Sequence, residues 1–107
     1  MSSAREKLLG QFRELVLERL DKIGKNLVRL EAGPDVESGK AALRELHGLK
    51  GEARMMGFAD INTLVHEMEE LVRSAEKTGY ALQPQSTDAL LVASDAVTVM
   101  SGAVPAR

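Results

Sequence analysis

The spacing of the apolar residues constrains the fold more than any other feature of this sequence. Apolar side chains recur three to five positions apart in four separate segments. This spacing places them on one face of an α-helix, and no segment alternates apolar and polar residues as a half-buried strand does. We therefore predict helices over residues 4–30, 35–56, about 60–78 and 88–100.

Turn and cap residues separate the four segments. They are Gly33-Pro34 after the first helix, Gly57 after the second, Asp60 as N-cap of the third, Thr78-Gly79 at its end, and Pro84 before a fourth helix capped by Ser86 or Thr87. Such short connections make neighbouring helices antiparallel. The expected fold class is all-α, an up-down antiparallel four-helix bundle.

A chain of 107 residues can bury one modest core. We place one domain at residues 1–100 and interpret residues 101–107 as the start of a linker to a missing downstream region. The core residues predicted for the first helix are Leu8, Phe12, Leu15, Leu20, Ile23, Leu27 and Leu30.

Composition excludes several classes of function. The formal net charge is −2 and the cationic residues are scattered among acidic ones, which argues against a nucleic-acid partner. The chain has no cysteine and therefore no disulfide or thiolate metal site. Its N-terminus lacks the apolar core of a signal peptide, and no apolar stretch is long enough for a membrane span, so we expect a cytoplasmic protein.

His47 lies on the polar side of the second predicted helix. Measured from the mean direction of the core residues at about 100° per residue, it points roughly 140° away, Arg54 about 120° and Lys50 about 80°. Gly48 and Gly51 flank this basic stripe, although each glycine costs a helix roughly 1 kcal/mol relative to alanine. We interpret both glycines as sites that open the imidazole to another protein, and Arg54 as a docking residue.

His66 and Glu69 are three residues apart on the outward or boundary face of the third predicted helix. A carboxylate beside an imidazole fixes its tautomer and raises the basicity of the far nitrogen. If the His47 imidazole accepted a phosphoryl group, the Lys50 ammonium would help balance the negative charge of that group. Together these residues provide a nucleophile, an orienting acid and a cation.

The stretch from His47 to Phe58 resembles the H-x-x-K-G-x-A-x-x-x-G-F signature of histidine-containing phosphotransfer (HPt) domains, those at the N-terminus of CheA-type chemotaxis kinases. His66-Glu67-Met68-Glu69 resembles the H-x-x-E element of that subfamily. The resemblance implies that an ATP-binding kinase domain, in cis or in trans, phosphorylates His47, which passes the group to a receiver-domain aspartate. It also implies that Glu69 hydrogen-bonds His47 and that Lys50 and His66 join the same network.

Glu52, Arg54 and Met55 depart from the small residues common in chemotaxis domains and resemble the FrzE-type gliding-motility variant. Chemotaxis domains usually have a fifth helix, which here would either be missing or lie beyond the chain end. By this resemblance the chain is not catalytic alone but a fragment of a CheA-like histidine kinase. It would bind no cofactor, and ATP and Mg²⁺ would belong to the partner kinase domain.

Other interpretations of the same residues stay open. The chain could be a free-standing HPt relay protein, or a helical docking module that is never phosphorylated. A metal site built from His47, His66 and Glu69 is a further alternative, but Lys50 and Arg54 beside it argue against a dication. We therefore expect no bound metal.

Overall fold

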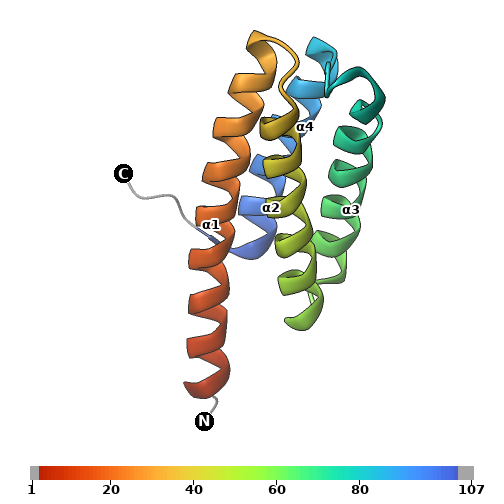
Figure 1. Ribbon diagram of the computed structural model, residues 1–107. Helices are drawn as coiled ribbons and strands as arrows, with labels where there is room; N and C mark the ends of the chain where they lie inside the picture. Colours follow the sequence, from red (N-terminus) through yellow and green to blue (C-terminus); the bar gives the residue numbers. More distant parts are fainter. Residues whose placement is uncertain (1–2, 104–107) are drawn as a thin grey trace.

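The structure, a computed structural model, describes residues 3–103. Its elements are α1 (Ser3–Ala32), α2 (Val36–Met55), α3 (Ala59–Arg73), the 3₁₀ turn η1 (Glu76–Thr78) and α4 (Pro84–Ser101). The four α-helices run alternately up and down (Figure 1). Residues 3–103 contain no strand and no fifth α-helix, so the predicted all-α four-helix bundle is confirmed.

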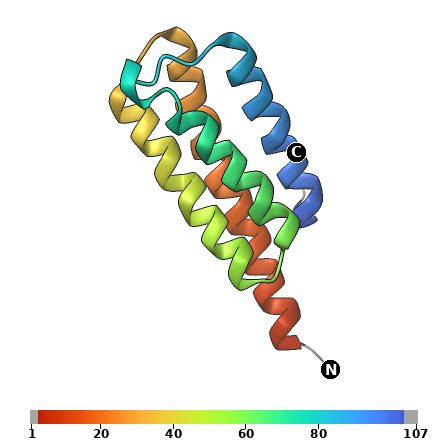
Figure 2. The ribbon, with the colours of Figure 1, turned by 90° about the vertical axis from the view of Figure 1, so that its right-hand side faces the viewer.

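The helices form a closed ring. α2 packs against α1 and α3, and α4 packs against the same two helices from the other side (Figure 2). α1 is the longest helix, with 30 residues, and its N-terminal end projects beyond the others (Figures 1 and 2). Apolar residues on that projecting end therefore have few neighbours to pack against.

The core is built from aliphatic side chains of all four helices and closed at one end by aromatic stacking. Its fully buried aliphatic residues include Val16, Ile23, Leu27, Leu46, Leu49, Ile61, Val65, Val72, Leu90 and Val97. Phe12 stacks on Phe58 with ring centroids 5.0 Å apart. The predicted burial of Leu8 and Leu15 is wrong, because they are 53% and 37% exposed at the edge of the core, where both border an open hollow next to the end of α2.

Asp35 is the N-cap of α2, where its side chain accepts hydrogen bonds from the backbone N–H groups of residues 37 and 38. The N-caps predicted for the third and fourth helices are wrong, whereas Gly57 does follow the end of α2, with a positive φ of 80°. α3 begins at Ala59, which places Asp60 in its first turn, where a carboxylate suits the helix dipole. α4 begins at Pro84 rather than after Ser86 or Thr87, because the fixed φ of proline suits the first helical position. α3 ends at Arg73, earlier than predicted, and η1 follows.

The end of α4 is held against α1. Arg13 Nε donates a hydrogen bond of 3.2 Å to the Ser101 carbonyl, and the Ala103 N–H donates one of 3.1 Å to Ser101 Oγ. The predicted linker spans residues 101–107, and its residues 104–107 lie outside the described part of the chain. Among the helices of residues 3–103, none combines the length and apolarity that a membrane span requires.

Candidate functional site

α2 turns one face to the core and carries His47 on another. Leu46 and Leu49 are fully buried. Because successive helical residues are rotated by about 100°, His47 between them points away from the core. Its side chain is 76% exposed, so the predicted solvent-facing position is confirmed.

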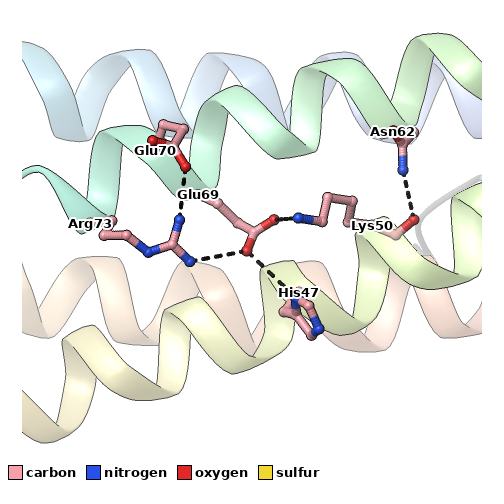
Figure 3. A network of polar contacts seen from close by, with 6 residues as sticks. All are labelled: His47, Lys50, Asn62, Glu69, Glu70 and Arg73. Atoms are coloured by element: carbon pink, nitrogen blue, oxygen red, sulfur yellow. Dashed lines mark hydrogen bonds and ion pairs between the residues drawn. The ribbon is translucent and has the colours of Figure 1, made fainter.

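Glu69 of α3 is the carboxylate that approaches His47. Its Oε2 lies 3.7 Å from His47 Nδ1, and its Oε1 forms an ion pair with Lys50 Nζ at 2.7 Å (Figure 3). The distance between Nδ1 and Oε2 is longer than a hydrogen bond, so the imidazole and the carboxylate face each other without a hydrogen bond between them. Glu69 is only 1% exposed, whereas Glu67 and Glu70 face solvent. It is thus buried more deeply than its predicted outward or boundary position.

The surroundings of Glu69 keep its carboxylate ionised. Burial acts to raise its pKa, but Lys50, Arg73 and His47 together outweigh burial, and the pKa lies below its usual range. Arg73 Nη2 lies 3.4 Å from Oε2. Arg73 was not among the predicted site residues, although its position one turn after Glu69 is a spacing at which opposite charges pair on a helix.

A side-chain hydrogen bond fastens α3 to α2 beside the site. Asn62 Nδ2 donates to the Lys50 carbonyl at 3.1 Å (Figure 3). Asn62 was not predicted as a site residue either. A weak signal was available, because asparagine has a low helix propensity and competes for backbone hydrogen bonds.

An open depression lies next to the imidazole. Its lining residues are His47, Lys50, Gly51, Arg54, Asn62 and His66. The two helices thus bring most of the predicted site residues to one place. His66 and Arg54 are both exposed at its edge, and within residues 3–103 no hydrogen bond or ion pair joins His66 to Glu69.

The two glycines beside His47 differ. A Cβ atom added at Gly51 would have no neighbouring heavy atom within 4 Å, in agreement with its predicted openness. A Cβ at Gly48 would stand 2.5–2.7 Å from the guanidinium of Arg19. That guanidinium donates to Glu52 at 2.7 and 2.8 Å and to Glu45 at 3.2 Å. The expectation that Gly48 leaves open space for a partner is therefore wrong, because Arg19 already fills it.

A metal site receives no support from the geometry. No group of three or more His, Asp or Glu side chains within residues 3–103 is arranged to hold an ion. The Lys50 ammonium also occupies the side of Glu69 that a metal ion would need.

Three comparisons with known proteins agree with one another. The Hpt domain family matches residues 7–97. Over 94 residues the chain is 38% identical to a Myxococcus xanthus protein described as a gliding motility regulatory protein, and the match covers 88% of this chain and 12% of that protein. Among solved structures, the CheA phosphotransferase domain from Thermotoga maritima is similar, with a TM-score of 0.84 and 31% identity over 90% of this chain and 92% of that one.

These matches extend over nearly all of the described bundle, and they include both helices that carry the site. They confirm the family that the residues from His47 to Phe58 indicated. The chain belongs to the Hpt domain family.

Proposed function

We propose that this domain accepts a phosphoryl group on His47 and passes it to an aspartate of a receiver domain. The observation that carries the proposal is the pairing of an exposed imidazole with a buried, ionised carboxylate, His47 with Glu69. A solvent-facing histidine without such a partner would be an ordinary surface residue.

The geometry supports a specific role for each ring nitrogen. Nδ1 faces Glu69, so this nitrogen holds the proton and Nε2 presents its lone pair to solvent. Attack of that lone pair on the γ-phosphorus of ATP forms an N–P bond, and the P–O bond to ADP breaks with its electron pair leaving on ADP. Glu69 remains a carboxylate and stabilises the positive charge that the ring acquires.

The second transfer reverses the bonding at His47. A carboxylate oxygen of the receiver aspartate attacks the phosphorus, the N–P bond breaks, and its electrons return to Nε2. The imidazole is then neutral and ready for another cycle. Lys50, Arg54 and His66 border the depression beside the ring, and the two cations Lys50 and Arg54 would offset the negative charge of the phosphoryl group.

ATP and Mg²⁺ would be bound by a separate kinase domain, in cis or in trans, and the reaction would take place in the cytoplasm. The chain spans 12% of its Myxococcus relative. We infer that it is the phosphoacceptor part of a CheA-like histidine kinase and not a catalyst alone. The names of the two relatives favour a pathway that controls chemotaxis or gliding motility.

The test is phosphorylation by the ATP-binding domain of a CheA-type kinase with [γ-³²P]ATP. We expect an acid-labile, alkali-stable label that is absent from His47→Gln and present in His66→Gln. Adding a receiver domain should discharge the label, and a receiver whose acceptor aspartate is replaced by asparagine should not. A label that persists in His47→Gln would contradict the proposal.

The same experiment addresses the docking alternative. A module that only binds its partners would take no label from any kinase, yet would still bind a receiver domain in a titration. That combination of results would favour docking over phosphotransfer.

A further inference from the structure

A cluster of three charged side chains on the α1 side of α2 has no part in the function proposed above. Arg19 of α1 places its Nε and Nη2 at 2.7 and 2.8 Å from the two carboxylate oxygens of Glu52, and its Nη1 at 3.2 Å from Glu45. The three side chains are 20–26% exposed. Three N–H groups of one guanidinium thus hold two carboxylates of the neighbouring helix.

The two carboxylates of this cluster come from residues before and after His47 in α2. Glu45 precedes His47 by two residues and Glu52 follows it by five. Both project roughly 140–160° from His47 around the helix axis, on the same side as Gly48. The guanidinium lies against Gly48 itself, whose Cα is about 3.8 Å from that of His47. Two acidic groups and their shared cation therefore lie within about one and a half turns of His47 along α2, on the opposite side of the helix from its imidazole.

We propose that Arg19 is a positioning residue for phosphoryl acceptance. It restrains Glu45 and Glu52 and offsets one of their two negative charges, so that less negative charge lies about a helix diameter from an incoming phosphoryl group. This inference rests on the proposed function of His47. It also explains why the residue after His47 is glycine, since any side chain there would displace the guanidinium.

The size of the effect follows from the separation of the charges. The cluster and the phosphoryl group are about 10 Å apart, roughly one helix diameter. At that distance across a solvated surface, one unit charge changes the rate of phosphorylation by roughly three- to tenfold. We expect Arg19→Ala to slow phosphorylation of His47 by that factor at low salt. The ratio should fall toward one at high salt, because salt screens exposed charges.

The experiment uses phosphoramidate as the donor, which releases ammonia when His47 attacks and requires no kinase. The chain is incubated with it and the phosphohistidine is followed by ³¹P NMR. The variants are Arg19→Ala, Arg19→Ala with Glu52→Gln, and the control Lys25→Ala. Lys25 pairs with Asp21 on the exposed surface of the same helix, so the control removes one cation from α1 without touching the cluster.

We expect Arg19→Ala to be slow at low salt, and the double variant, which has regained the native net charge, to return to within about twofold of the wild-type rate. Lys25→Ala should leave the rate unchanged. An unaffected Arg19→Ala, a double variant as slow as the single one, or an equally slow Lys25→Ala would each overturn the role of Arg19. Circular dichroism of each variant checks that it is folded. Failure of the wild-type chain to be phosphorylated, or phosphorylation of His47→Gln, would instead contradict the proposed function itself.

Discussion

Alanine substitutions at the two glycines beside His47 should have different effects on stability. A Cβ at Gly51 meets nothing within 4 Å. Gly51→Ala therefore adds only helix propensity, which stabilises the domain by about 0.8–1 kcal/mol. For a domain of this size such a gain raises Tm by about 4–8 °C.

Gly48→Ala gains the same helix propensity but displaces Arg19. The new Cβ would stand 2.5–2.7 Å from three guanidinium atoms, so the ion pairs with Glu52 and Glu45 must break. Because these side chains are partly exposed, each pair contributes only about 0–1 kcal/mol. The two pairs together contribute about 0–2 kcal/mol, so Gly48→Ala should be less stabilising than Gly51→Ala, with a net change from just under about 1 kcal/mol of stabilisation to about 1 kcal/mol of destabilisation.

Urea unfolding followed by circular dichroism at low salt measures both values. A double-mutant cycle provides the internal control: in an Arg19→Ala background the guanidinium is gone, and Gly48→Ala should stabilise by about 0.8–1 kcal/mol, as Gly51→Ala does in the wild type. If Gly48→Ala stabilises the wild-type chain as much as Gly51→Ala, Arg19 does not lie over Gly48 and the reasoning is refuted.

Four further variants test the interface between α2 and α3 and the core beneath it. The pKa of Glu69 is lowered by folding, so its ionised form adds stability above the unfolded pKa of about 4.3 and this contribution is lost as the pH falls below it. The difference in unfolding free energy between wild type and Glu69→Gln should therefore shrink from neutral to strongly acidic pH in urea titrations. Lys50→Met leaves that carboxylate without its 2.7 Å partner and should destabilise by about 1–3 kcal/mol in the same assay; no loss would mean that the ion pair is not formed. Asn62→Ala removes one hydrogen bond to the Lys50 carbonyl and should cost about 0.5–1.5 kcal/mol, with faster amide hydrogen exchange in that turn of α2. Leu49→Ala empties a fully buried position and should cost about 2–5 kcal/mol in thermal unfolding, and a smaller loss would contradict its place in the core.

Local periodicity explains what could be predicted from the sequence. The helices and the exposure of His47 depend on residues within one or two turns of each other, such as Leu46 and Leu49, and these contacts repeat along the chain. The burial of Leu8 and Leu15 was predicted wrongly because both lie at the edge of the apolar stripe of α1, and the pattern does not show how far around the helix its neighbours cover it.

The missed features depend on contacts between helices. Arg19 is 33 residues from Glu52 in the sequence, and no spacing rule within one helix connects them. The depth at which Glu69 is buried depends on how α2 and α3 face each other, which an amphipathic pattern defines only to within a broad arc. The space at Gly48 likewise depends on the conformation of a long side chain from α1.

The place of His47 on a convex helical surface limits the order of events in signalling. An imidazole in the middle of α2, 76% exposed, can enter the cleft of only one partner at a time. If His47 carries the phosphoryl group as proposed, a kinase and a receiver would use the same ring in turn, and the two half-reactions should follow ping-pong kinetics. Under that scheme, a large excess of unphosphorylated receiver would compete with the kinase for His47. The relative abundance of the two partners would therefore affect the rate of phosphotransfer.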